Sequence, residues 1–216
     1  MIFNRLKIFV LRRVYTFTAK HAWRKNTGPS VETSDVEIPV DDGHIALRLY
    51  KPISKQPLSV VLFYHGGGFV IGDIDAYDDM CRDLSHRPER IVVSVGYRLA
   101  PEHPFPCAPH DCMQALQWTY DHIEDFGGRN DMIYLAGDSA GGNLAAITAL
   151  AARDKLPGLL KGQILIYPVT DHYDSATPSY SENARGQRLT RNMMFWFWDM
   201  NYRDRVLIKA GETKHS

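Results

Sequence analysis

The sequence lacks an excess of charge of either sign, since its 216 residues include 25 Lys and Arg and 25 Asp and Glu. A balanced chain gives no global reason to expect nucleic acid or an anionic surface as a partner. It also lacks any run approaching the ~18 apolar residues that a membrane-spanning helix needs. Residues 1–10 are interrupted by charge, and no small-residue cleavage site follows them, so no secretory leader is expected. The expectation is a cytoplasmic protein.

Cysteine is scarce, and the three that occur are Cys81, Cys107 and Cys112. An odd number at this spacing fits neither a zinc site nor a redox pair. Free and mostly buried thiols in a reducing compartment are therefore expected. No metal and no organic cofactor is expected.

The chain is long enough for one sizeable core, with 44% apolar residues. We divide it into an N-terminal segment (1–30), a core (31–202) and an unpatterned tail (203–216). Within residues 2–24, apolar side chains recur at helical spacing between basic ones, and the first 31 residues contain seven basic residues and no acidic one. This pattern predicts an amphipathic helix. Such a helix can cap the protein's own site or lie on a membrane surface.

Strand-like and helix-like segments alternate along the core. Strands are expected at 36–40, 45–50, 58–64, 91–95, 132–136 and 162–167, and helices at 77–86, 112–126, 139–153 and 189–202. This alternation predicts an α/β fold with a mostly parallel sheet and helices on both faces. Function then belongs at the carboxyl ends of the strands. The last helix, with Thr190 as N-cap, carries a band of aromatic residues and methionines that fits core packing or a substrate lid.

Gly137, Ser139 and Gly141 form the Gly-Xaa-Ser-Xaa-Gly pattern between an expected strand and an expected helix. In a nucleophile elbow the serine sits on a sharp strand-to-helix turn, where a Cβ on the flanking glycines would collide with neighbouring backbone. The hydroxyl is then exposed at a helix N-terminus, whose free N–H groups favour developing negative charge. Ser139 is the candidate nucleophile.

A rarer pattern, His65-Gly66-Gly67-Gly68, follows the expected strand at 58–64. Successive glycines leave their N–H groups unobstructed, and acyl transfer needs such donors for its oxyanion. One well-placed donor is worth roughly 3 to 4 kcal/mol in the transition state. Gly67, Gly68 and Ala140 are the candidate oxyanion donors, and His65 is expected to hold the loop. The competing interpretation is a flexible loop without function.

Three blocks lie in a fixed order along the chain: His65-Gly66-Gly67-Gly68-Phe69, Tyr97-Arg98-Leu99-Ala100-Pro101-Glu102-His103-Pro104-Phe105-Pro106 and Gly137-Asp138-Ser139-Ala140-Gly141-Gly142-Asn143-Leu144-Ala145. Together they resemble the hormone-sensitive-lipase-like carboxylesterase branch of the α/β-hydrolases. The resemblance implies an α/β-hydrolase fold and a carboxylesterase acting on small acyl esters under a cap made partly from the N-terminal helix. It also implies that Arg98 and Glu102 are structural supports.

A serine hydroxyl needs a histidine to take its proton and a carboxylate to orient that histidine. In this fold the order along the chain is serine, acid, histidine. The candidates downstream of Ser139 are Asp171, His172, Asp174, Asp199, Asp204 and His215. None is expected to serve: Asp171 and His172 are adjacent and would point to opposite sides, and His215 lies in the tail.

The acid and the histidine of the triad are therefore expected to be absent from this chain. One explanation is a C-terminally incomplete α/β-hydrolase that lacks the last strands of its sheet. The other is a natural short form that binds acyl compounds without catalysis. An amidase or arylformamidase-like hydrolase on the same scaffold is a further alternative. Small-molecule esters are the expected ligands, and the oligomeric state is not predicted.

Overall fold

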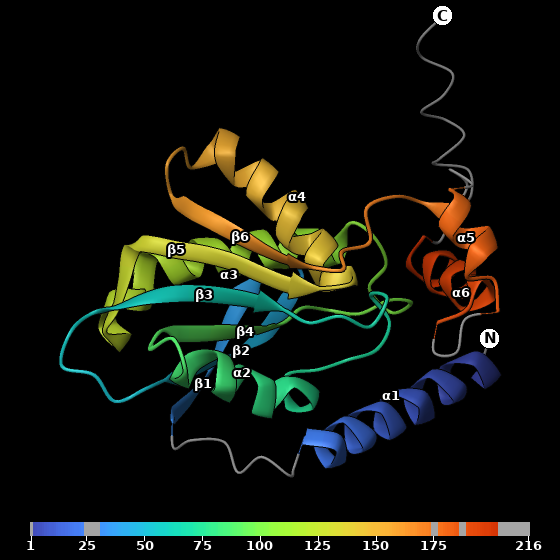
Figure 1. Ribbon diagram of the computed structural model, residues 1–216, viewed down its shortest axis with the longest axis horizontal. Helices are drawn as coiled ribbons and strands as arrows, with labels where there is room; N and C mark the ends of the chain where they lie inside the picture. Colours follow the sequence, from blue (N-terminus) through green and yellow to red (C-terminus); the bar gives the residue numbers. More distant parts are fainter. Residues whose placement is uncertain (1, 24–30, 174–176, 186–188, 203–216) are drawn as a thin grey trace, which may run out of the picture.

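The computed structural model describes residues 2–23, 31–173, 177–185 and 189–202, and a six-stranded sheet of order β1-β2-β4-β3-β5-β6 runs through its middle (Figure 1). The strands are β1 (Glu32–Val40), β2 (Gly43–Lys51), β3 (Leu58–Tyr64), β4 (Ile91–Gly96), β5 (Gly128–Asp138) and β6 (Leu160–Ile166). The helices are α1 (Ile2–Trp23), α2 (Asp78–His86), α3 (Cys107–His122), α4 (Ala140–Lys155), α5 (Pro178–Glu182) and α6 (Arg191–Asn201), with short 3-10 turns at Asp75–Tyr77 and Ile123–Phe126.

The sheet is parallel from β4 through β3 and β5 to β6, while β1 and β2 form an antiparallel hairpin at one side. The hairpin turns at Asp41 and Asp42, next to Gly43, whose φ of 147° suits glycine. A mostly parallel α/β sheet is thereby confirmed.

Alternate residues of β3 enter two different cores. Val60, Leu62 and Tyr64 pack in the larger core beneath α3 and α4, whereas Val61 and Phe63 pack in the smaller core beneath α2. Successive side chains of a strand point to opposite faces, so a strand buried on both faces needs a continuous apolar run. The prediction of helices on both faces is confirmed.

The predicted elements all form, with shifts at their ends. The largest shift is in α3, which begins at Cys107 and not at Cys112. Pro109 lies in the first turn of α3, where its missing N–H needs no intrahelical partner. Helix α5 was not predicted, because five residues are too few to show a helical period.

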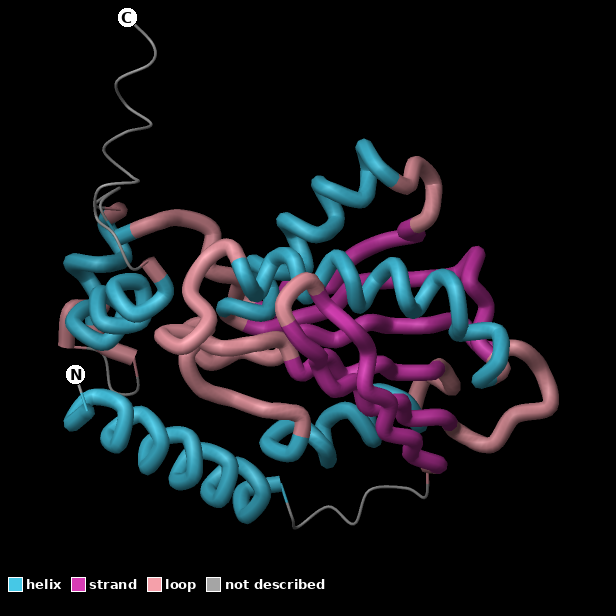
Figure 2. Tube along the Cα trace, turned by 180° about the vertical axis from the view of Figure 1, so that it is seen from behind, coloured by secondary structure: helices cyan, strands magenta, loops and turns pink. Residues whose placement is uncertain are grey.

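The strands of the parallel part point toward one end of the molecule, where α5, α6 and the N-terminal end of α1 also lie (Figure 1). Figure 2 shows the same arrangement from behind, with loops gathered between the strand ends and these helices. The first and last described helices therefore meet at the carboxyl edge of the sheet, where the sequence places the site.

Strand β6 lies at the edge of the sheet and pairs only with β5 among the described strands. Its side chains Ile164 and Leu165 are exposed. A strand of a parallel sheet is ordinarily covered on both faces. Strand β6 is therefore less covered than a strand inside a parallel sheet.

Candidate active site

Ser139 occupies a sharp turn between β5 and α4. Its φ of 52° and ψ of −116° are rare for a residue with a Cβ, and the surrounding hydrogen bonds hold them. Its N–H donates to the carbonyl of Ile166 at 2.9 Å, and its own carbonyl accepts the N–H groups of Asn143 and Val169 at 3.1 Å each. The hydroxyl is half-exposed and makes no hydrogen bond with another described residue.

The turn is closed by glycines that leave no room for a side chain. A Cβ on Gly137 would overlap the carbonyl of Gly141, and a Cβ on Gly141 would overlap the carbonyl of Tyr64 at the end of β3. A Cβ on Gly142 would lie 3.0 Å from the ring of Pro168. Helix α4 can begin this close to β3 only because these positions are glycine, as the sequence pattern predicts.

The glycine loop follows β3 directly. Gly67 and Gly68 have φ values of 117° and 60°, which strain any residue with a side chain. A Cβ on Gly68 would enter the ring of Phe197 on α6. The carbonyl of Gly67 accepts two N–H groups, from Val70 at 3.1 Å and Ile71 at 3.0 Å. The N–H groups of Gly67 and Gly68 themselves donate to no described residue.

His65 holds the start of this loop, as expected. Its Nδ1 lies 2.7 Å from the carbonyl of Gly66, and its ring stacks on Tyr97 at 4.4 Å between centroids. The Tyr97 hydroxyl donates to the His65 carbonyl at 2.7 Å. Burial lowers the pKa of His65 to about 4, so the ring is neutral at neutral pH.

Asp138 ties the serine turn to the glycine loop, a role that was not predicted. Its carboxylate accepts the N–H of Gly66 at 2.8 Å and the hydroxyl of Tyr77 at 3.0 Å. Burial raises the pKa of Asp138, and these two hydrogen bonds oppose that rise. The only sequence signal for this role was the position of the aspartate beside Ser139.

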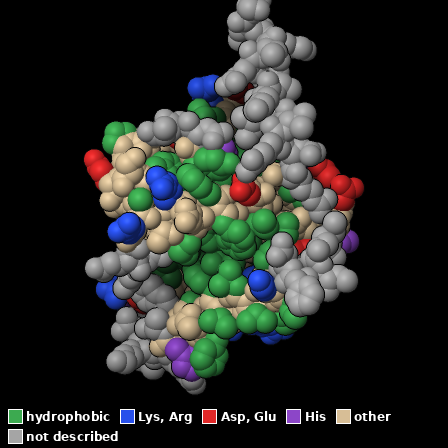
Figure 3. Space-filling model, turned by 90° about the vertical axis from the view of Figure 1, so that its right-hand side faces the viewer, with side chains coloured by type: hydrophobic (Ala, Val, Ile, Leu, Met, Phe, Trp, Pro, Cys, Tyr) green, Lys and Arg blue, Asp and Glu red, His purple; other side chains and the backbone are tan. Residues whose placement is uncertain are grey.

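Ser139 and the two glycines border one small apolar cavity of about 200 Å³. Its walls are formed by Gly67, Gly68, Phe69, Ile71, Ser139, Val169, Leu189, Met193, Met194, Phe197 and Trp198. A larger cavity of about 640 Å³ also reaches Ser139 and is bordered by the segment after β6 and by α5. Figure 3 looks onto this end of the molecule and shows hydrophobic side chains gathered at its centre.

A family model described as "alpha/beta hydrolase fold" matches residues 61–209. Esterase LipI of Mycobacterium tuberculosis is 42% identical over 164 residues, which are 74% of this chain and 51% of that protein. The solved structure of the carboxylesterase EstE1, from a metagenomic library, superposes with a TM-score of 0.88 at 41% identity, covering 91% of this chain and 68% of that one. The chain belongs to the hormone-sensitive-lipase-like carboxylesterase branch of the α/β-hydrolases.

Two further esterases match over a similar share of this chain and of their own length. A hyperthermophilic esterase from Pyrobaculum calidifontis gives a TM-score of 0.87 at 38% identity, covering 91% of this chain and 65% of that one. An arylesterase of Saccharolobus solfataricus is 39% identical over 166 residues, 76% of this chain and 53% of that protein. The chain spans about half the length of the curated relatives that it matches.

The second of the three sequence blocks, Tyr97–Pro106, holds the site in place, as the resemblance implies. Arg98 forms a two-pronged ion pair with Asp111, whose side chain is fully buried, at distances down to 2.7 Å. The backbone N–H of Arg98 also donates to Asp111 at 2.9 Å. Glu102 pairs with Arg12 of α1 at 2.8 Å. These contacts join α3 and α1 to the loop after β4.

Among the described residues no acid or histidine downstream of Ser139 hydrogen-bonds to its hydroxyl, although Asp171 borders the larger cavity that also reaches Ser139. Asp171 accepts the N–H of His172 at 2.7 Å, and the His172 ring packs edge-on against Trp198 at 5.0 Å. Asp199 accepts the hydroxyl of Tyr173 at 3.1 Å. The remaining candidates, Asp174, Asp204 and His215, lie outside the described residues.

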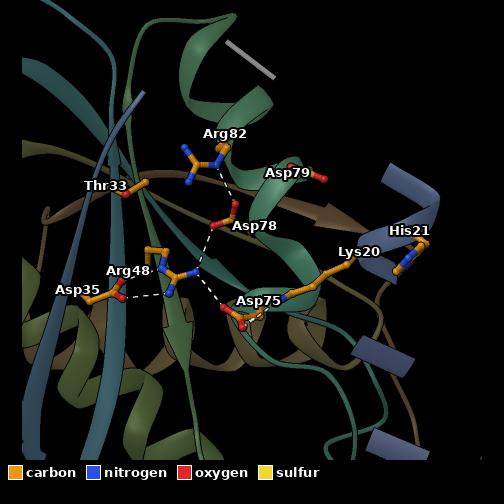
Figure 4. Close-up of a pocket in the computed structure, with 9 residues that line it drawn as sticks. All are labelled: Lys20, His21, Thr33, Asp35, Arg48, Asp75, Asp78, Asp79 and Arg82. Carbon is orange, nitrogen blue, oxygen red and sulfur yellow. Dashed lines mark hydrogen bonds and ion pairs between the residues drawn. The ribbon is translucent and has the colours of Figure 1, made fainter. Parts of the chain in front are cut away.

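A third cavity, of about 520 Å³, shares no wall residue with the two at Ser139 (Figure 4). Arg48 lies at its centre and contacts Asp35 at 2.6 Å, Asp75 at 2.9 Å and Asp78 at 3.1 Å. Asp75 also pairs with Lys20 of α1 at 2.8 Å. This network fastens α1 to the hairpin and to α2.

Proposed function

We propose that Ser139 is the nucleophile of a carboxylic ester hydrolase acting on small acyl esters. Its Oγ bonds to the acyl carbon and gives its proton to a base, the alcohol leaves with a proton, and water then cleaves the acyl-enzyme. One observation carries the proposal: a strained serine at a helix N-terminus shares a 200 Å³ cavity with two glycines whose N–H groups have no described partner.

The same arrangement assigns the oxyanion donors. In this proposal the N–H groups of Gly67, Gly68 and Ala140 stabilise the tetrahedral intermediate, each contributing roughly 3 to 4 kcal/mol in the transition state. Ala140 is the first residue of α4, where backbone N–H groups lack intrahelical acceptors and the helix dipole favours negative charge. Asp138 and His65 act through the loop and not on the substrate.

The cavity dimensions support a small acyl group. At about 200 Å³ the inner cavity is smaller than the roughly 300–1,000 Å³ of sites for drug-sized ligands. Phe197 and Trp198 form part of its wall. In this proposal the acyl chain enters the inner cavity and the alcohol lies in the larger one.

The acid and the histidine of the triad are, in this proposal, absent from the 216 residues. No described histidine hydrogen-bonds to Ser139. Loss of triad members costs about a millionfold in kcat and leaves roughly 10³ to 10⁴ over water. Hydrolysis of a short-chain aryl ester by this chain is therefore expected to be very slow.

The experiment treats the 216-residue chain with a serine-directed arylphosphonate and maps the adduct by mass spectrometry, with Ser139→Ala as the matched control. We expect slow labelling confined to Ser139. An adduct at another serine, or none above that of the denatured chain, would overturn the nucleophile assignment. Labelling at the rate of an ordinary esterase would contradict the predicted absence of a base and leave the nucleophile assignment intact.

A second candidate is cleavage of amides on the same serine. The arylacetamide deacetylase of Bos taurus is 40% identical over 190 residues, 82% of this chain and 48% of that protein. Matched aryl acetate and acetanilide substrates distinguish the two, because only the leaving group differs. A chain that saturates with both compounds and releases no product from either would instead be a non-catalytic acyl binder.

A further inference from the structure

One face of helix α1 packs against the rest of the protein. Ile8 is buried against the loop after β3 together with Val70. Arg12 donates to the carbonyls of Val70 and Ala100 at 2.8 Å each, and Thr16 donates to Asp73 at 2.6 Å. These contacts fix which side of the helix faces away from the protein.

The outward face is apolar, the reverse of an ordinary surface helix. Five large apolar side chains are between 51% and 63% exposed, and they are Leu6, Phe9, Val10, Val14 and Phe17. Their spacing of three and four residues places them in one stripe along the helix. A surface helix normally turns polar residues outward, and a contiguous exposed apolar stripe marks a contact with something else.

The charged side chains of α1 are all basic, and two of them, Arg12 and Lys20, pair with Glu102 and Asp75. Lys7 and Arg13 are exposed and form no ion pair with a described residue, and the Arg13 guanidinium lies 5.3 Å from the ring centre of Phe9. No acidic residue occurs in the first 31 positions. An apolar stripe edged by cations is the composition of helices that lie in the headgroup region of a membrane.

We propose that the outward face of α1 binds the surface of an anionic phospholipid bilayer. The helix would lie in the plane of the surface, since no described helix is long and apolar enough to cross a membrane. Helix α1 itself lies along the outside of the molecule, at one side of the sheet (Figures 1 and 2). A protein partner would need a matching groove with acidic walls, whereas a bilayer accepts any convex apolar face and supplies the negative charge.

Membrane binding through α1 would also affect the surroundings of the Ser139 cavity, because α1 packs against α6. Ile8 packs in one cluster with Trp196 and Phe197 of α6, and Phe197 also borders the cavity of Ser139. A bilayer under α1 would therefore lie beside the end of the molecule that holds this cavity. The inference goes beyond the proposed ester hydrolysis and does not require Ser139 to react.

The experiment measures sedimentation of the 216-residue chain with vesicles of phosphatidylcholine alone and with added phosphatidylserine. We expect binding to the anionic vesicles that weakens as salt is raised. The double variant Val10→Ser/Phe17→Ser is expected to bind about tenfold more weakly because it removes apolar area. The double variant Lys7→Glu/Arg13→Glu is expected to bind the anionic vesicles about tenfold more weakly, because it reverses two positive charges.

Matched controls come from an exposed loop elsewhere. The control variants are Ile53→Ser, at a side chain that is 92% exposed, and Lys55→Glu. Neither is expected to alter binding to the vesicles. Unchanged circular dichroism and unfolding midpoints show that the α1 variants are folded. Ser139→Ala is expected to bind vesicles like the parent chain, which separates this inference from the proposed function.

Three results would overturn the inference. The first is no binding to either vesicle, and the second is binding that the α1 variants leave unchanged. The third is a concentration-dependent dimer, seen by sedimentation velocity, that Val10→Ser/Phe17→Ser abolishes, since the face would then join two copies of this chain.

Discussion

His65 illustrates how the surroundings of one side chain set its protonation. The ring is buried between Tyr97 and Tyr77 and keeps its Nδ1 2.7 Å from the carbonyl of Gly66. A charged imidazolium would lose its hydration there, so burial favours the neutral form. A histidine in this state can hold the glycine loop but cannot carry charge at neutral pH.

Acidification is expected to destabilise the protein through His65. The folded-state pKa of about 4 lies below the ordinary value of 6.5, so the unfolded chain binds the proton first. The stabilisation is complete above the unfolded pKa and is lost as the pH falls toward the folded one, by about 3 kcal/mol in total. Urea unfolding at a series of pH values checks this, with His65→Gln as the control that removes this dependence. An equal slope in both proteins would contradict it.

Replacement of Asp138 by alanine is expected to loosen the glycine loop. It removes the closer of the two acceptors of the Gly66 N–H and the acceptor of the Tyr77 hydroxyl, both in partly or fully buried surroundings. The expected loss in the free energy of unfolding is about 2 to 4 kcal/mol. Asp138→Asn keeps an acceptor for Gly66 and is expected to lose about half as much. Equal losses in the two variants would show that the charge, and not the acceptor, stabilises the loop.

The first turn of α4 packs directly on the backbone at the end of β3, too close for a side chain at Gly141. Because a Cβ on Gly141 would overlap the carbonyl of Tyr64, Gly141→Ala must push α4 away from β3. We expect a loss of about 1 to 3 kcal/mol in the free energy of unfolding. In Gly162→Ala the new Cβ would lie 3.4 Å from Tyr134, an ordinary contact, and this matched variant is expected to be nearly neutral. A thermal melt of both variants decides the comparison.

The bounds of most helices and strands follow from short-range sequence patterns, such as apolar runs and capping residues. The continuous apolar run at Leu58–Tyr64 gives β3 its full length, and Thr190 caps α6 by accepting the N–H of Met193. The start of α3 was missed because Pro109 is tolerated in a first turn. The sequence left the aromatic band of α6 open between core packing and a substrate lid, and its packing against the main core is confirmed. Trp198 is buried in the main core and also borders the cavity of Ser139.

For the molecule as a whole, the sequence placed the candidate site residues at the ends of two strands but did not predict that these strands are neighbours. Ser139 and the glycine loop meet because β3 and β5 pair in parallel, with Tyr64 opposite Gly137. Short-range patterns cannot fix that pairing. The contacts that depend on it, such as the carboxylate of Asp138 on Gly66 and the ring of Phe197 on Gly68, were therefore not predicted. The charged cavity around Arg48 was missed for the same reason.

The 216-residue chain is expected to self-associate through β6. The outer edge of β6 pairs with no described strand, and Ile164 is 42% exposed on it. Unpaired strand edges template pairing with other chains, and a lysine on such an edge opposes it. Ile164→Lys is therefore expected to lower the apparent mass in light scattering, whereas Leu150→Lys, a change of an exposed leucine on α4, is not. A monomer at every concentration would contradict this.

The hydrogen bond from Gly66 to Asp138 makes the two halves of the site depend on each other. Neither the bend at Ser139 nor the row of glycines can take its shape until β3 and β5 are in register. A chain with those strands misaligned would therefore form neither the bend at Ser139 nor the glycine loop beside it. Substitutions elsewhere on the cavity walls can change its shape while leaving this joint assembly intact.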